Sequence, residues 1–277
     1  MDIRNSSRQS EDSRRTGFAA AERMEHYGTV HETPLKVVAV IQARTGSSRL
    51  PGKVLRPLAG RPVLAWMIRA ASAARGVDEV VVATSTAPGD DAVAELAASS
   101  GVRVVRGSED DVLSRFVLAL EETAADAIVR LTADCPLVDP VLVSQVVALW
   151  RADPTLEYVA TTLQRTLPRG LDVELASRGA LLAADAEARD HHRVHVTSYL
   201  YAAADRDFRR LGIVVAPTAN ELRVTLDTPE DAEAIEAIVD RLGDTPPRWH
   251  EVVDLLRGDP ALVEKNAAVR QKALADG

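Results

Sequence analysis

The stretch VVAVIQARTGSSRLPGK at residues 37–53 constrains the fold of this chain more than any other part of it. Its apolar start, residues 37–41, predicts a buried parallel strand. The strand breaks into a glycine-containing loop with three cations, Arg44, Arg49 and Lys53. Small residues let a backbone approach a ligand, and N–H groups beside cations suit a polyphosphate. A helix expected at 63–75 completes the strand, loop and helix of a nucleotide-binding turn in an open α/β sheet.

The loop matches neither of two common phosphate-binding motifs. A P-loop that ends at Lys53 requires Gly at position 47 and Ser or Thr at position 54, whereas the chain has Ser47 and Val54. The loop is not GxGxxG either. A surface loop with scattered charges is the simple alternative, and three cations among two glycines directly after a strand argue against it.

Strands and helices alternate along the first half of the chain. Further strands are expected at 79–83, 102–105 and 127–131, each followed by a helix. This rhythm predicts an α/β fold with a doubly wound, mostly parallel sheet. Ligands of such sheets bind beyond the carboxyl ends of the strands. The loops that should therefore share one rim carry Arg44, Thr84, Arg106 and Asp134.

The pattern changes after residue 153. Residues 158–161 and 171–175 predict an inserted antiparallel hairpin around a turn at 168–170. Later elements are helices at 177–188 and 191–204, strands at 212–215 and 222–226, and a helix opened by Thr228 and Pro229. Residues 35–277 are interpreted as a single domain that carries the hairpin.

Composition excludes several classes of protein. The 277 residues include 46% hydrophobic ones, enough for a substantial core, and the net charge is −8. That charge argues against a general nucleic-acid or membrane binder, and no apolar run approaches the length of a membrane span. The single cysteine, Cys135, excludes an intramolecular disulfide and fits a cytoplasmic location. Residues 1–34 are polar and without a period, and are interpreted as a disordered leader.

Six motifs carry a resemblance to a known family. The chain resembles the cytidylyltransferase superfamily, which includes CMP-ketodeoxyoctonate and CMP-sialate synthetases, and within it the spore-coat polysaccharide biosynthesis protein F group. The likeness covers about residues 36–277 and implies a nucleotide-diphospho-sugar transferase-like fold. The motifs are IQARTGSSRLPGK, RGSEDDVLSRF, VRLTADCPLVDP, GLDVE, HVTSY and LRVTLDTPED, in the family's order.

The resemblance implies an activity: transfer of CMP from CTP to a small-molecule acceptor, with release of pyrophosphate. Arg44 and Lys53 stand where the family holds triphosphate, and the side chain of Arg49 can serve there or point away. The base is expected over the loops at 84–86 and 106–108. The candidate nucleotide-binding residues are Gln42, Ala43, Arg44, Gly46, Arg49, Lys53, Thr84, Arg106, Ser108 and Asp134, of which Arg44, Lys53 and Asp134, with Asp227, are the candidate catalytic residues.

The cofactor that the resemblance implies is Mg²⁺, held by Asp134 and Asp227. Each aspartate follows an apolar strand, and a hard cation takes carboxylate oxygens. Each also has a structural alternative, because Asp is common in turns and at helix N-caps. For Asp227 the neighbouring Thr228 offers a different cap, which would leave the carboxylate free.

The acceptor-binding candidates are Asp172, Glu174, His195 and Tyr199, with core packing an equal alternative for the last two. His191 and His195 lie one helical turn apart and suggest zinc, which the absence of an HExxH pattern or a nearby cysteine disfavours. The family has Glu before HVT, where this chain has Val194. That difference argues against a carboxylate role at this position and indicates either a different acceptor or a lost contact.

Two other functions stay open. A glycosyltransferase that uses a nucleotide sugar commonly holds metal through Asp-x-Asp, and here Cys135 and Pro136 follow Asp134. A non-catalytic nucleotide-binding partner in polysaccharide assembly is the second. The family commonly dimerises through its antiparallel insert, so a homodimer through residues 158–175 is expected.

Overall fold

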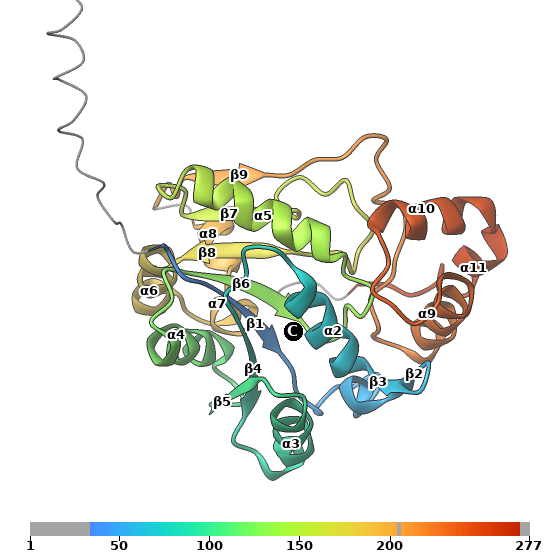
Figure 1. Cartoon of the computed structure of the whole chain (residues 1–277), viewed down its shortest axis with the longest axis horizontal. Helices are drawn as coiled ribbons and strands as arrows, with labels where there is room; N and C mark the ends of the chain where they lie inside the picture. Colours follow the sequence, from blue (N-terminus) through green and yellow to red (C-terminus); the bar gives the residue numbers. More distant parts are fainter. Residues whose placement is uncertain (1–33, 204–205, 272–277) are drawn as a thin grey trace, which may run out of the picture. The chain divides into compact units, whose positions relative to one another are not determined.

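The structure is a computed structural model that describes residues 34–203 and 206–271. Residues 35–277 are grouped as one compact unit, and the expected leader at 1–34 lies almost wholly outside the described residues. Within the described part, a seven-stranded sheet has the order β5-β4-β1-β6-β8-β7-β9 (Figure 1). Its strands are β1 (Val37–Gln42), β4 (Glu79–Ser85), β5 (Arg103–Gly107), β6 (Ala127–Thr132), β7 (Tyr158–Ala160), β8 (Glu174–Ser177) and β9 (Arg210–Gly212).

Four neighbouring strands, β5, β4, β1 and β6, are parallel. β1 pairs with β4 and with β6, in a register that places Val40 beside Val81 and Arg130, and β4 pairs with β5. Residues 37–41 are completely buried because the strand is covered on both faces, which explains its continuous apolar run. The predicted mostly parallel sheet is confirmed, and the loops that follow these four strands leave the same edge.

The antiparallel pair forms inside the main sheet, and its second strand lies at Glu174–Ser177 instead of the expected 171–175. β8 runs antiparallel between β6 and β7, and β9 adds in parallel to β7. The strand expected at 212–215 instead begins at Arg210, and 222–226 forms no strand but one isolated bridge between Arg169 and Arg223. A second, two-stranded antiparallel sheet is made by β2 (Pro57–Leu58) and β3 (Arg61–Pro62).

Helices cover both faces of the sheet and divide the core in two. Alternate residues of β1 point to opposite faces: Ile41 packs with Trp66 in one core, and Val40 packs with Phe116 in the other. The helices are α2 (Val63–Ala73), α3 (Asp91–Ser99), α4 (Val112–Thr123), α5 (Pro140–Ala152), α6 (Arg178–Glu187), α7 (His191–His195), α8 (Ser198–Ala202), α9 (Pro229–Leu242), α10 (Trp249–Gly258) and α11 (Pro260–Glu264), with 3-10 turns η1 (Lys53–Leu55) and η2 (Pro88–Asp90).

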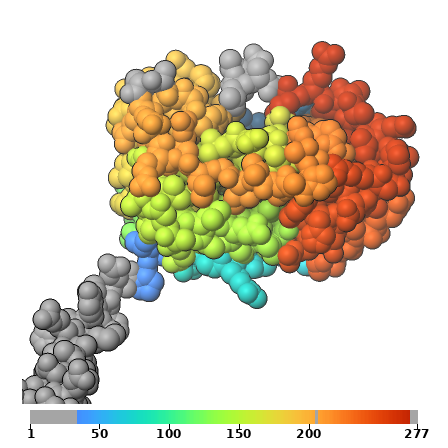
Figure 2. Space-filling model, turned by 90° about the horizontal axis from the view of Figure 1, so that it is seen from above, coloured from blue at the N-terminus to red at the C-terminus, as the bar shows by residue number. Residues whose placement is uncertain are grey.

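The C-terminal helices α9, α10 and α11 pack together and close one end of the molecule, red in Figure 2. The expected helix at 191–204 is two short helices, because Val196 between them has φ 54° and ψ −70°. Thr197 N donates to His195 O at 2.6 Å, which closes a γ-turn of the rare, strained kind. No helix in the described part of the chain is long and apolar enough to cross a membrane.

Candidate active site

A cleft of about 960 Å³ opens at the edge where the parallel strands end. The loop after β1 forms one wall, and residues after β6, around β8 and near Asp227 form the others. Eleven of the residues predicted for the site line this cleft: Gln42, Ala43, Arg44, Gly46, Arg49, Lys53, Asp134, Asp172, Glu174, His195 and Asp227.

Lys53 joins the two predicted metal ligands. Its Nζ donates to Asp134 Oδ2 at 2.8 Å and to Asp227 Oδ1 at 2.7 Å. The side chains of Lys53 and Asp227 are nearly buried, whereas that of Asp134 is 25% exposed. Two carboxylates from distant parts of the sequence thus converge on one cation, at a position open to the cleft.

The backbone places these two aspartates side by side. Leu226 N donates to Asp134 O at 2.8 Å, which joins the segment before Asp227 to the loop after β6. Gly170 packs so closely that a Cβ on it would lie 2.6 Å from Val224 C, and its φ is +103°. Only glycine suits this contact. The turn predicted at 168–170 therefore serves to support the segment that carries Asp227.

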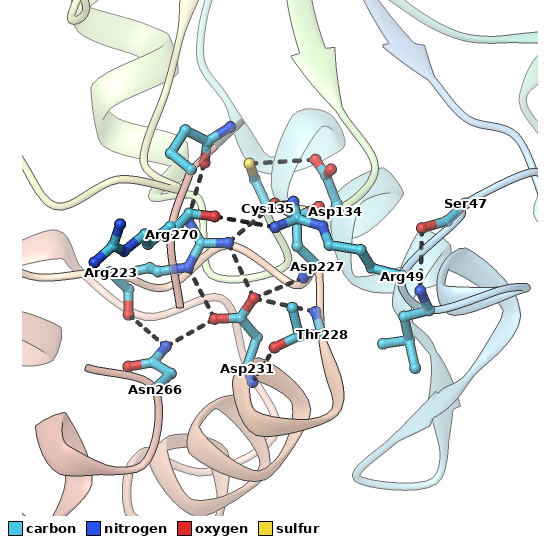
Figure 3. Close-up of polar contacts among 12 residues, drawn as sticks. Ser47, Arg49, Asp134, Cys135, Arg223, Asp227, Thr228, Asp231, Asn266 and Arg270 are labelled. Carbon is cyan, nitrogen blue, oxygen red and sulfur yellow. Dashed lines mark hydrogen bonds and ion pairs between the residues drawn. The ribbon is translucent and has the colours of Figure 1, made fainter. Parts of the chain in front are cut away.

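Asp227 is surrounded by cations (Figure 3). Besides Lys53, Arg49 lies 3.0 Å and Arg223 2.9 Å from its Oδ2. Burial alone would raise the pKa of Asp227, but Lys53, Arg223 and Arg49 outweigh it, so its pKa lies below the ordinary value. Burial likewise lowers the pKa of Lys53 less than the two carboxylates raise it. The carboxylate and the ammonium are therefore both charged near neutral pH.

A second carboxylate, Asp231, holds Arg223 in place. Arg223 donates to both oxygens of Asp231, at 2.9 and 3.0 Å, and Asn266 donates to Asp231 Oδ1 at 2.9 Å (Figure 3). Asp231 is completely buried and also accepts from Asp227 N. Thr228 provides the N-cap of α9. The cap alternative for Asp227 is thereby excluded, because its carboxylate faces the cations of the cleft.

The loop after β1 is fixed by Asp90, the last residue of η2. Asp90 Oδ1 accepts from Thr45 N at 2.7 Å and from Thr45 Oγ1 at 2.8 Å, and Oδ2 accepts from Ser85 N and Oγ. Burial would raise the pKa of Asp90, and these hydrogen bonds lower it further than burial raises it. The cationic loop is thus anchored to the end of β4.

The residues predicted to hold the base lie outside this cleft. Thr84 is completely buried, and its Oγ1 has no hydrogen-bond partner. Arg106 donates to Ser85 O and Ala87 O and pairs with Asp91. Ser108 Oγ accepts from Asp111 N. The arginine and the serine thus organise the loops after β4 and β5, and their contact with a base stays a prediction.

The acceptor candidates divide into three in the cleft and one outside it. Glu174 is buried and accepts from Tyr158 and Thr197, and it pairs with Arg130, which stands directly opposite it between β6 and β8. Asp172 forms a two-pronged pair with Arg165. His195 lines the cleft, whereas Tyr199 lies outside it and donates a hydrogen bond to Glu187.

Several arginines of the cleft were missed at the level of sequence. The motifs around two of them, RGSEDDVLSRF and VRLTADCPLVDP, were recognised, but nothing in a strand or helix pattern says that a basic side chain turns toward the rim. The one sequence signal for Arg115 and Arg130 is that each lies inside a motif of the family. The missed arginines are Arg115, Arg130, Arg165, Arg169 and Arg210.

Zinc at His191 and His195 and a thiolate at Cys135 are two further chemistries to consider. Among residues 34–203 and 206–271, no group of three His, Cys, Asp or Glu side chains that could hold a metal ion is found. Cys135 is buried, and burial raises the pKa of its thiol well above the ordinary value, so a thiolate nucleophile is disfavoured.

A doubly wound sheet with a cationic loop and two converging carboxylates at its rim defines a nucleotide-binding α/β transferase. The profile of the cytidylyltransferase family matches residues 38–241. The chain belongs to this family and is a nucleotidyltransferase.

Known relatives agree with this assignment. Spore coat polysaccharide biosynthesis protein SpsF of Bacillus subtilis is 34% identical over 242 residues, 83% of this chain and 98% of that protein. The 8-amino-3,8-dideoxy-manno-octulosonate cytidylyltransferase of Shewanella frigidimarina is 35% identical over 43% of this chain and 49% of its own length. A solved cytidylyltransferase of Leptospira borgpetersenii superposes with a TM-score of 0.80 at 29% identity, covering 86% of this chain and all of that one.

Proposed function

We propose that this protein transfers CMP from CTP to a small acceptor with release of pyrophosphate. The acceptor oxygen forms a bond to the α-phosphorus, and the bond from that phosphorus to the bridging oxygen of the β-phosphate breaks. The observation that carries the proposal is the convergence of Lys53, Asp134 and Asp227 beside a cationic loop in one cleft. The names of the relatives support CTP as the nucleotide.

Arg44, Arg49 and Lys53 are assigned to the triphosphate. Arg44 and Arg49 line the cleft from the loop, and Lys53, which is buried, lines it as well. Guanidinium groups bind phosphate oxygens through two parallel hydrogen bonds, and an ammonium acts as a point charge. Their role is to orient the nucleotide and to stabilise the charge that develops on the departing pyrophosphate.

Asp134 and Asp227 are assigned to a divalent cation, Mg²⁺ in the first place. Their oxygens fit it, because they already converge on one ammonium, and one or two carboxylates together with phosphates suffice for Mg²⁺. When bound, the ion supplies Lewis-acid polarisation and a template for the phosphates. For such an ion to bind both aspartates, Lys53 would have to break at least one of its two ion pairs with them.

The acceptor is assigned to the wall made by β8 and its neighbours. That wall offers buried Glu174 with Arg130, and Asp172 with Arg165. Carboxylates accept from hydroxyl groups and arginines donate to anions, so a small hydroxylated acceptor with an anionic group suits it. The name of the Bacillus relative places that protein in polysaccharide synthesis and supports a sugar-derived acceptor here.

A pyrophosphate-release screen tests the proposal. CTP, UTP, ATP and GTP are each supplied with Mg²⁺ and a panel of sugar acids, amino sugars, sugar phosphates and phosphonates. The expected result is release with CTP and with one acceptor class. Hydrolysis of a nucleotide sugar instead would indicate a glycosyltransferase, and tight CTP binding without turnover on any acceptor would indicate a non-catalytic partner.

A further inference from the structure

Arg115 on α4 is a cation that the reaction described above does not use. It lines the cleft, yet its side chain is 1% exposed. Its Nε and Nη1 are buried and have no hydrogen-bond partner. An arginine with a structural role normally satisfies these donors with carbonyl or carboxylate oxygens.

The surroundings of Arg115 hold the aliphatic part of its side chain and leave the charge of its guanidinium without a paired carboxylate. A Cβ on Gly107 would lie 2.9 Å from Arg115 Cγ, so the stem is packed against the loop after β5. Burial lowers the pKa of Arg115, and the like charge of Arg44 lowers it further. Arg44 belongs to the loop after β1. Arg44 in this loop and Arg115 near the start of α4 are therefore two like charges that act on one another in the cleft.

The nearby carboxylates are engaged elsewhere or exposed. Asp90 is occupied by Thr45 and Ser85, and Asp111 accepts from Ser114 N and pairs with Arg193. Glu109 is exposed. These groups act on Arg115 through space only, and none of them is a hydrogen-bond partner of its two buried nitrogens.

A buried guanidinium without partners is costly, because both its charge and its N–H donors lose water. A second cation beside it adds repulsion. An anion in the cleft would remove both costs at once, since a phosphate group offers several oxygens to two guanidinium groups. Arg44 and Arg115 line the same cleft as Lys53, Asp134 and Asp227, so an anion held between the two arginines would lie in that cleft.

We propose that Arg115 and Arg44 together bind a phosphate group of the nucleotide substrate, which makes Arg115 a binding residue for the triphosphate. This proposal rests on the proposed function for the identity of the ligand. It also implies that the ligand-free protein is destabilised locally to keep the guanidinium ready, a cost often found at functional sites.

The test measures binding and stability of Arg115→Met and Arg115→Lys. Titration calorimetry with CTP, inorganic tripolyphosphate and cytidine gives affinities, and thermal melts give the Tm of the ligand-free protein. Arg103→Met is the matched control, because Arg103 is exposed on β5 and paired with Glu79. In Arg115→Met we expect at least about tenfold weaker binding of CTP and of tripolyphosphate, and a ligand-free Tm equal to or above that of the wild type. Arg115→Lys should recover part of the affinity.

Three results would overturn the proposal. One is unchanged CTP affinity in Arg115→Met. Another is a loss for CTP and cytidine with tripolyphosphate unchanged, which would assign Arg115 to the nucleoside. The third is a lower Tm in the ligand-free variant, which would mean that the guanidinium already stabilises the fold. Tripolyphosphate binding that depends on Arg115, without any turnover of CTP, would uphold the anion position while the proposed function fails.

Discussion

The carboxylate of Asp227 is held between three cations, Lys53, Arg49 and Arg223. The pattern of Asp before Thr-Pro predicted either a cap or a metal ligand, and Thr228 was available as the cap. The structure uses Thr228 in that way. The partners Arg223 and Asp231 were not predictable, because the direction of a long side chain depends on segments that meet only in the fold. The same holds for Arg115, whose environment combines two separate loops.

Lys53 should compete with a metal ion in the absence of nucleotide. Its ammonium bridges the carboxylates of Asp134 and Asp227. In Lys53→Met the two carboxylates lose a shared counter-ion and gain affinity for a divalent cation. We expect roughly tenfold tighter binding of Mn²⁺ without nucleotide, equal to about 1.4 kcal/mol, and weaker binding of CTP.

Calorimetric titration with Mn²⁺ checks this expectation. Lys36→Met is the control, because Lys36 pairs with Glu79 next to the start of β1, away from the cleft. Unchanged or weaker Mn²⁺ binding in Lys53→Met would show that the two carboxylates do not form one cation site.

Acid should destabilise the ligand-free protein in part through Asp227. The pKa of Asp227 is lowered in the folded state, so its stabilising contribution is present above the unfolded pKa of about 3.9 and is lost as the pH falls through the folded pKa. Asp227→Asn should be less stable than the wild type at pH 6, and the difference should shrink below about pH 4.

Urea midpoints between pH 6 and pH 3 provide the measurement. Asp240→Asn, on the exposed side of α9, should follow the wild type throughout. A difference between Asp227→Asn and wild type that stays constant down to pH 3 would argue against a charged Asp227 in the folded protein.

Among the secondary-structure elements, those with strong local patterns were predicted well. The strands near 37–41, 79–83, 102–105 and 127–131 are present, because continuous apolar runs suit strands buried on both faces. The segment 222–226 looked alike but makes one bridge only, since its role is to carry Asp227 beside Asp134. The helix at 191–204 is interrupted by strained backbone at Val196. No glycine or proline stands at that point of the sequence, so the break could not be predicted.

The anchoring of the loop after β1 by Asp90 can be tested directly. Asp90→Ala removes four hydrogen bonds to a buried carboxylate, including the one from Thr45 N. Because hydrogen bonds to charged groups contribute about 1.5–3 kcal/mol each when broken singly, we expect a loss of several kcal/mol in unfolding free energy. CTP binding should weaken as well.

Chemical denaturation and CTP titration measure the two effects. Glu95→Ala, exposed on the following helix α3, is the control. If Asp90→Ala bound CTP with wild-type affinity, the loop would not need this anchor for its function.

Within a single subunit, the segment 158–175, which was expected to mediate dimerisation, is largely buried. Tyr158, Val159, Leu171 and Leu175 are completely buried within their own subunit. A homodimer remains our prediction, and we place its contact at the neighbouring edge strand β9, whose residues are exposed or half-buried. Val214, just beyond β9, is a large apolar side chain that is 55% exposed.

Light scattering should give twice the protomer mass of 29.8 kDa at micromolar concentration. Val214→Glu should weaken the dimer, because it would bury a charge at the contact. Leu182→Glu is the matched control, because Leu182 is an exposed apolar side chain on α6, and it should leave the dimer intact. A monomeric wild type would contradict the prediction.

The most direct test of the central claim is the Mg²⁺ dependence of pyrophosphate release from CTP in four proteins: the wild type, Asp134→Asn, Asp227→Asn and the double variant. If both carboxylates hold one ion, each single change should cost at least ~10² in rate, the two losses should not add, and raised Mg²⁺ should restore part of the activity of each single variant. Near-wild-type activity of Asp227→Asn with an unchanged Mg²⁺ profile would contradict the account, because Asp134 would then be left as the single carboxylate of the site.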